Sequence, residues 1–346
     1  MSMEQIDLIS NELARADEIK DDAAQVIGMM RVKSALETIK EASERPNPQP
    51  LWLSLWYESE ACCLFADSNL GKSILAVQIA ESLARSGKKV LYFDFELSDK
   101  QFQIRYTDEM GNLYQFSPNL FRVEIDALSM YAENFEEALL DNIEQCADEI
   151  GADTIIIDNI SWLCTAAEKG DLAGALMMRL TQIKRRTGLS ILVIAHTPKR
   201  NLSNPITQND LAGSKKLMNF FDSSFAIGKS AKDSTLRYIK QIKCRNGGFE
   251  YDAENVIVCQ IKKTDAFLQF ETIDHATEAE HLKQQSELAI QERIEKVREL
   301  SKKGLSQRQI ASQLGISPAS VNNYLKRAGK VDEAVRENEA AKEDEE

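Results

Sequence analysis

The chain has 346 residues, of which 43% are hydrophobic and 28% charged, values typical of a globular protein with more than one folding unit. Its 15 glycines and 7 prolines are too few for a collagen-like or low-complexity chain. The apolar runs are strand-sized, well short of the roughly 18 residues that span a bilayer. The N-terminal residues lack the basic and apolar regions of a signal peptide. We therefore expect a cytoplasmic protein with no membrane partner.

The net charge of −13 is unevenly distributed along the chain. Residues 331–346 hold eight acids and two bases, whereas residues 301–330 hold six bases and no acid. A wholly basic segment within an acidic chain indicates a separate module that could meet nucleic acid. The six cysteines show neither C-x-x-C spacing nor a histidine at zinc-finger spacing, which excludes a structural zinc site or a disulfide framework.

In chain order, residues 3–44 carry apolar side chains at helical spacing, and three prolines between positions 46 and 50 end that pattern. We therefore predict an N-terminal helical segment with a Pro-rich linker over residues 1–50. From 51 to 277, strand-sized apolar runs alternate with amphipathic stretches, which predicts an α/β domain with a mainly parallel twisted sheet and an antiparallel end. The predicted strands are 61–65, 90–95, 121–125, 154–158, 191–195, 224–227, 236–242, 256–261 and 267–271. The predicted helices are 72–86, 99–108, 133–149 and 171–187.

The first strand of this domain leads into a phosphate-loop pattern that a helix follows. This strand–loop–helix context is the one in which G-x-x-x-x-G-K-[ST] binds nucleotides. Lys72 is then expected to reach the β and γ phosphates of ATP, and Ser73 to ligate Mg²⁺. Ala66 stands where the pattern has its first glycine, which eases the backbone turn. The predicted loop consists of Ala66, Asp67, Ser68, Asn69, Leu70, Gly71, Lys72 and Ser73.

An acid ends the strand predicted over 154–158. A carboxylate at the carboxyl end of such a strand lies beside the phosphate loop, where it can hold the hydration shell of Mg²⁺. We therefore predict that Asp158 acts with Ser73 at the metal. The alternative is a capping aspartate after a buried strand.

Glu96 closes the strand that follows the phosphate-loop helix. At this point the sequence resembles the RecA-type ATPases, and most closely the plasmid RepA-type and DnaB-like hexameric helicases. The resemblance implies a RecA-like P-loop fold in which Glu96 activates the attacking water, as general-base chemistry requires. The alternatives are that Glu96 is only an acid at the start of the next helix, or that Asp94 is the base.

The resemblance extends from about residue 56 to 277 and includes a sensor strand over 191–195. It implies that His196, at the end of this strand, senses the γ-phosphate, although a lone histidine is often structural. The polar loop after it corresponds to a DNA-facing loop of the family. The residues that could neutralise DNA phosphates there, or could equally be solvated surface cations, are Lys199, Arg200, Lys215 and Lys216.

Residues 242–248 resemble the K-x-R-N-G segment of DnaB-like helicases. The resemblance implies that Lys243 and Arg245 reach the ATP of the neighbouring subunit, since a strand presents residues i and i+2 on one face. In that case a homo-oligomeric ring, a hexamer in this family, is the working unit. The alternative is a charged hairpin before a Gly-Gly turn.

Residues 278–330 resemble a three-helix unit with a helix-turn-helix. Ser306 can cap one helix, Gly315 can supply the turn, and Pro318 suits the first position of the next helix. Such a module meets duplex DNA or serves as a protein-docking domain. We expect the acidic tail at 331–346 to be disordered. The residues predicted to face DNA are Ser317, Ser320, Asn322, Asn323, Lys326 and Arg327.

Together these features predict an ATP- and Mg²⁺-dependent motor of the RepA-like helicase group, bound to DNA. The resemblance implies a role in the replication or mobilisation of a plasmid or mobile element, with the proteins of that process as partners. One alternative is a non-translocating ATPase switch, a DNA-bound regulator or loader. Another is a DNA-binding protein with a nearly inactive ATP site, which the alanine in the phosphate loop suggests.

Overall fold

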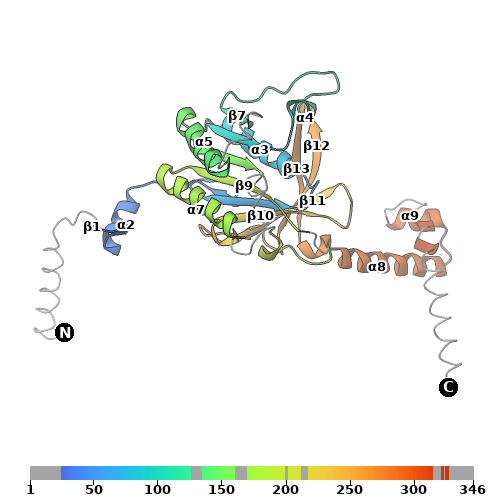
Figure 1. The fold of residues 1–346 in the computed structure, drawn as a ribbon. Helices are drawn as coiled ribbons and strands as arrows, with labels where there is room; N and C mark the ends of the chain where they lie inside the picture. The colour runs from blue at the N-terminus through green and yellow to red at the C-terminus, as the bar shows by residue number, and fades with distance from the viewer. Residues whose placement is uncertain are drawn as a thin grey trace, which may run out of the picture. The chain divides into compact units, whose positions relative to one another are not determined.

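The computed structural model describes residues 25–125, 135–159, 170–198, 202–211, 217–314, 321–322 and 324–326. The chain divides into two compact units, Met1–Gln49 and Pro50–Glu346 (Figure 1). Across the described part of the chain, no helix has the length and apolar character needed to cross a bilayer.

The described part of the first unit differs from the helix predicted over residues 3–44. Strands β1 (Gln25–Ile27) and β2 (Met30–Val32) form an antiparallel hairpin, and only α2 (Ala35–Ser43) is helical. Gly28 adopts a left-handed conformation (φ 58°) at the turn, which explains why the chain reverses here instead of continuing as a helix. The helical prediction is therefore wrong for residues 25–32, and residues 3–24 lie outside the described residues.

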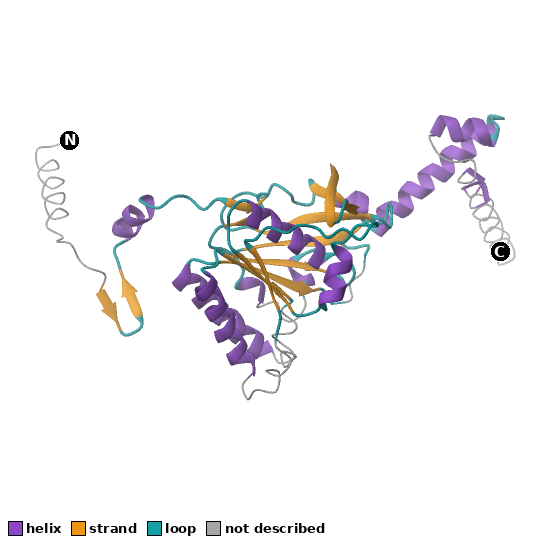
Figure 2. Ribbon diagram, turned by 90° about the horizontal axis from the view of Figure 1, so that it is seen from above, coloured by secondary structure: helices purple, strands orange, loops and turns teal. Residues whose placement is uncertain are grey.

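A nine-stranded sheet forms the centre of the second unit, as far as the structure describes it (Figure 2). Its strand order is β13-β12-β11-β10-β5-β9-β8-β6-β7. The pairs from β10 to β7 are parallel and those from β10 to β13 antiparallel, as predicted. The strands are β5 (Ala61–Ala66), β6 (Val90–Asp94), β7 (Leu120–Val123), β8 (Thr154–Asp158), β9 (Ser190–His196), β10 (Ser223–Lys229), β11 (Leu236–Lys243), β12 (Val256–Thr264) and β13 (Phe267–Ala276). A separate small sheet pairs β3 (Pro50–Trp52) with β4 (Trp56–Tyr57).

Helices cover both faces of the parallel strands (Figure 2). On one face, α3 (Lys72–Arg85) packs against the even-numbered residues of β5, including Cys62. On the other face, α5 (Phe135–Ile150) and α7 (Gly170–Thr187) pack against the odd-numbered residues, including Cys63. Alternate side chains of a strand point to opposite faces, so a strand buried on both faces reads as one continuous apolar run. This burial fixes the carboxyl ends of β5, β6, β8 and β9 at one edge of the sheet.

The antiparallel end of the sheet folds back over the phosphate-loop helix. The Gln78 side chain accepts a hydrogen bond from Phe270 N (2.8 Å) and donates one to Phe270 O (3.0 Å), which ties α3 to β13. Further short helices are α4 (Asp99–Arg105), η2 (Gln208–Asp210), η3 (Leu217–Asn219) and η4 (Glu278–His281).

The described C-terminal part contains α8 (Lys283–Lys302), α9 (Gln307–Leu314) and helical residues at 321–322 and 324–326. Val297, Ile310 and Val321 are fully buried together in a small apolar core. Ser306 exchanges hydrogen bonds with Gln309, which caps α9 as predicted. The predicted turn at Gly315 and the predicted first helical position at Pro318 lie outside the described residues.

Candidate nucleotide-binding site

The phosphate loop joins the carboxyl end of β5 to the first turn of α3. Its backbone is left-handed at Asn69 (φ 63°) and at Gly71 (φ 95°), the residue that precedes α3. A Cβ atom on Gly71 would lie 2.7 Å from the Ile261 side chain and 2.9 Å from the Phe270 ring, so this position needs glycine for space as well as for conformation. The loop ends at a helix N-terminus, where unpaired N–H groups and the helix dipole favour a phosphate.

Ala66, which stands in place of the first glycine of the pattern, is the last residue of β5 and is buried. It is not among the residues with positive φ, so its backbone suits an L-amino acid. Its carbonyl oxygen accepts hydrogen bonds from Lys72 Nζ (3.0 Å) and from Thr197 N (3.2 Å). The loop conformation therefore accommodates an alanine at this position.

Lys72 is 7% exposed and its ammonium group is held at three points. It lies 3.0 Å from Ala66 O, 3.1 Å from Asp67 O and 3.1 Å from His196 Nδ1. Burial lowers its pKa, and the nearby carboxylates of Asp158, Glu96 and Asp67 oppose this shift. A cation so enclosed by neutral and negative groups is placed to receive an anionic phosphate.

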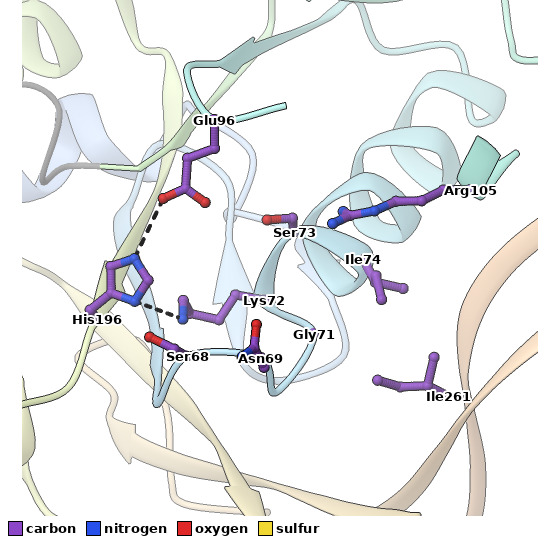
Figure 3. Close-up of a pocket in the computed structure, with 10 residues that line it drawn as sticks. All are labelled: Ser68, Asn69, Gly71, Lys72, Ser73, Ile74, Glu96, Arg105, His196 and Ile261. Atoms are coloured by element: carbon purple, nitrogen blue, oxygen red, sulfur yellow. Dashed lines mark hydrogen bonds and ion pairs between the residues drawn. The ribbon is translucent and has the colours of Figure 1, made fainter. Parts of the chain in front are cut away.

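His196 lies between Lys72 and Glu96 (Figure 3). Its Nε2 atom is 3.6 Å from Glu96 Oε1 and 3.1 Å from Asn159 Nδ2. Asn159 also donates to Glu96 Oε1. The contact with His196, with smaller contributions from Lys72 and from the hydrogen bond that Asn159 donates, lowers the pKa of Glu96 despite partial burial. The structure thus brings Glu96, His196 and Lys72 together, and it adds Asn159, which the sequence analysis missed.

Asp94 and Glu96 differ in what surrounds them. β6 ends at Asp94 and not at Phe95 as predicted, and Asp94 Oδ1 accepts hydrogen bonds from Glu96 N (3.2 Å) and Leu97 N (3.0 Å). Its other oxygen pairs with Arg122 Nε at 2.9 Å. Asp94 therefore holds the turn after β6, and this turn carries Glu96 into the pocket.

Ser73 and Asp158, the two predicted metal ligands, lie in hydrogen-bonding contact. Asp158 is buried at the end of β8, where Tyr92 donates a 2.6 Å hydrogen bond to its Oδ2. Burial raises the pKa of Asp158 to about 6, although the bonds from Ser73 and Tyr92 lower it. A hydroxyl and a carboxylate are oxygen donors of the kind that Mg²⁺ takes beside phosphates, so these residues fit the predicted ion.

Lys72, Ser73, Glu96 and His196 line a pocket of about 480 Å³, a size usual for small-molecule sites (Figure 3). Arg105, from the end of α4, points into it from the side opposite His196, and Ile261 of β12 closes it near Gly71. The sequence analysis missed Arg105 because no motif marks the helix that carries it. The lining residues are Ser68, Asn69, Gly71, Lys72, Ser73, Ile74, Glu96, Arg105, His196 and Ile261.

Two parts of the chain are similar to known protein families. The model of a family described as "AAA domain" matches residues 30–201, and that of "Sigma-70, region 4" matches residues 301–330. The DNA repair protein RadA of Halalkalibacterium halodurans is 26% identical over 190 residues, which cover 52% of this chain and 35% of that protein. The DNA helicase/primase of Enterobacteria phage T3 is 24% identical over 220 residues, which cover 55% of this chain and 39% of that protein.

The fold is that of a RecA-type P-loop ATPase. A helix-turn-helix module follows it, so the predicted fold class is confirmed. The chain spans little more than a third of the length of these curated relatives. A KaiC-like protein from Pyrococcus horikoshii aligns with a TM-score of 0.46 at 12% identity, over 62% of this chain and 91% of that one.

Lys243 and Arg245, the two residues predicted to reach a neighbouring subunit and called the finger below, lie at the sheet edge opposite the phosphate loop. Lys243 ends β11 and pairs with Ser224 at the start of β10, whereas Arg245 lies beyond the strand end. The expectation that both share one strand face is therefore wrong. They nevertheless meet the same segment, because Lys243 Nζ donates to Met218 O (2.7 Å) and Arg245 Nη2 donates to Asn219 O (3.1 Å).

Most residues predicted to face DNA lie outside the described residues. Asn322 and Lys326 are described, and both are exposed in the helical stretch that follows the predicted turn. The residues of which nothing structural can be said are Lys199, Arg200, Lys215, Lys216, Ser317, Ser320, Asn323 and Arg327.

Proposed function

We propose that this protein is an ATP-hydrolysing, DNA-associated motor of the RepA-like hexameric helicase type. The observation that carries the proposal is the convergence of Lys72, Glu96 and His196 in one pocket at the end of the phosphate-loop strand. A cation for the phosphates, a carboxylate for the water and a polar group between them are the parts that phosphoryl transfer needs.

In this proposal Lys72 binds the β and γ phosphates, and the phosphate-loop residues 66–73 enclose them. Glu96 accepts a proton from the attacking water, a role that its position supports because its carboxylate lines the pocket and Asn159 holds it there. Ser73 and Asp158 hold Mg²⁺, which neutralises phosphate charge when bound. Arg105 adds a second cation to the pocket in cis.

We further propose that Lys243 and Arg245 complete the site of a neighbouring subunit. Arg245 contacts Asp222, whose backbone N–H bonds to Ala61 O at the start of β5, whereas the phosphate loop begins after Ala66. The distance from Ala61 to Ala66 is about 17 Å along the strand, which is more than an arginine side chain can span. Arg245 therefore cannot reach the phosphate loop of its own subunit. A contact that joins opposite edges of two copies is heterologous and closes into a ring when the rotation permits, which supports a ring; six subunits is the number that the resemblance implies.

The DNA half of the proposal rests on the C-terminal module and on the relatives. The module contains the acid-free basic segment, and its described residues Asn322 and Lys326 are exposed. One relative is named a DNA helicase/primase and another a DNA repair protein. We propose that the loop residues Lys199, Arg200, Lys215 and Lys216 face single-stranded DNA in the ring. The residues of the C-terminal module that we propose to face duplex DNA are Ser317, Ser320, Asn322, Asn323, Lys326 and Arg327. The process that we propose is replication or mobilisation of a plasmid or mobile element.

The second candidate is a non-translocating ATPase switch that is bound to DNA as a regulator or loader. The similarity of residues 301–330 to sigma-70 region 4 favours it, because a helix-turn-helix holds a protein at a duplex site and does not follow a strand. The third candidate is a DNA-binding protein with a nearly inactive ATP site. Ala66 was the reason to consider it, and Ala66 has an ordinary strand conformation.

Unwinding of a forked duplex, measured beside ATP hydrolysis, separates these candidates. A motor unwinds the fork only with ATP and Mg²⁺, and Glu96→Gln stops both activities. A switch hydrolyses ATP and changes its DNA affinity with the nucleotide, but leaves the fork paired. If the protein neither hydrolyses ATP nor changes its DNA affinity with the nucleotide, both candidates are rejected.

A further inference from the structure

Asp222 is a carboxylate at the amino edge of the sheet, and both of its oxygens are engaged. Oδ1 pairs with Arg245 Nη1 at 3.0 Å. Oδ2 accepts from Lys184 Nζ at 2.5 Å and from the backbone of Ala61 at 2.9 Å. Its side chain is only 14% exposed, whereas that of Arg245 is 54% exposed.

This arrangement fixes one side of the guanidinium and leaves the other side to solvent. Arg245 donates from Nη1 to Asp222 and from Nη2 to Asn219 O, at 3.0 and 3.1 Å. A guanidinium has five N–H donors in a rigid plane, so donors remain for an incoming phosphate. Two points of attachment on a planar group also fix its direction.

The anchor is itself rigid because it belongs to the buried sheet. The backbones of Asp222 and Ala61 bond to each other, with Asp222 N 2.8 Å from Ala61 O. Lys184, from the last turn of α7, holds the carboxylate from a third side. Ala61 begins the strand that ends at the phosphate loop of the same subunit. Arg245 is thus attached through Asp222 to the strand that carries its own nucleotide site.

We propose that Asp222 is the positioning residue for Arg245, which it holds in the orientation that meets the γ-phosphate of the neighbouring subunit. This inference rests on the proposed function of Arg245 in trans. An ordinary exposed aspartate–arginine pair contributes little to stability. Here the pair acts on the reaction, because a positioned cation stabilises charge only where it is held in place.

The test is Asp222→Asn in the full-length chain, assayed with Mg²⁺ and ATP. We expect the KM for ATP to stay within about twofold and kcat to fall about tenfold or more, since a small misplacement of a positioned group can cost up to about 10²-fold. Asp222→Glu, which keeps the charge but moves it by one methylene, should give a smaller loss of the same kind. Asp141→Asn, which removes an exposed pair with Arg179, is the matched control and should hydrolyse ATP normally.

Mixing of subunits distinguishes positioning from folding. Asp222→Asn subunits mixed with Lys72→Ala subunits should recover activity, because one supplies an intact pocket and the other an intact finger. Mixed with Arg245→Ala subunits they should not recover, because both lack a working finger. Wild-type turnover of Asp222→Asn, or failure with both partners, overturns the inference. If Arg245→Ala and Lys72→Ala themselves fail to complement in confirmed mixed rings, the proposed finger in trans is what fails.

Discussion

At the scale of single residues, the surroundings of Asp94 and Glu96 separate a structural carboxylate from a reactive one. Glu96→Gln should retain ATP binding and lower hydrolysis by about 10²-fold or more, the usual range for loss of a positioned base. Asp94→Asn should lower hydrolysis less and should destabilise the fold, because it weakens the pair with Arg122 and the turn at Leu97. Single-turnover hydrolysis and equilibrium nucleotide binding measure both effects. A larger loss of turnover in Asp94→Asn would mean that Asp94 is the base.

Glu60 gives a pH dependence of stability whose sign is fixed by its burial. Burial raises the pKa of Glu60 above its ordinary value, although Ser223 and the Tyr57 backbone donate hydrogen bonds to it. The folded protein therefore keeps a proton that the unfolded chain loses as the pH rises above about 4.3. The free energy of unfolding, measured relative to Glu60→Gln, should thus fall as the pH rises from about 4.3 through the raised pKa of Glu60 in the folded protein. Urea unfolding at several pH values tests it, and a difference that rises with pH would contradict it.

At the scale of elements, Glu278 of η4 and Lys240 of β11 form a buried ion pair at 2.5 Å. Glu278 also accepts hydrogen bonds from Ile206 N (2.7 Å) and from the Tyr238 hydroxyl (3.2 Å). Glu278→Ala leaves a buried ammonium without its counterion and should lower the free energy of unfolding by about 3–5 kcal/mol. Lys232→Ala removes an exposed pair with Glu280 and should lower it by less than about 1 kcal/mol. Equal losses in the two variants would contradict this ranking.

The strands of the RecA-type domain could be predicted because their apolar runs are buried on both faces. Thr154–Asp158 begins and ends as predicted, since a buried strand bounded by polar residues has no competing interpretation. The hairpin at 25–32 could not be predicted from the sequence, because its few apolar residues fit helical spacing as well as strand alternation. Only the left-handed turn at Gly28 decides between the two.

The candidate site was predicted where a motif carries it and missed where tertiary packing does. Lys72, Ser73, Asp158 and His196 follow strand ends or the phosphate loop, so the topology alone brings them together. Arg105 reaches the pocket from a helix that no motif marks. Asn159, Asp222 and their partners are recognisable only from contacts between segments far apart in the sequence.

At the scale of the whole molecule, nucleotide and duplex binding should depend on different parts of the chain. Deletion of residues 282–330 should leave basal ATP hydrolysis nearly unchanged and should weaken duplex binding, because the acid-free basic segment is lost. Lys326→Ala should lower the log–log salt slope of duplex binding by about one, as expected for one lost phosphate contact. Asn322→Ala should instead reduce discrimination between sequences. Fluorescence anisotropy over a salt series tests these effects, and no duplex binding by the full chain even at low salt would identify a docking module instead.

ATP hydrolysis by the purified chain and by Lys72→Ala tests the proposed nucleotide site most directly. Lys72 is the cation that the loop, His196 and the nearby carboxylates enclose, so its loss removes the charge partner of the phosphates. We predict Mg²⁺-dependent hydrolysis by the wild-type chain, and no detectable hydrolysis with weakened nucleotide binding in the variant. Undiminished turnover in Lys72→Ala would contradict the proposed role of this pocket, because the reaction would then take place elsewhere.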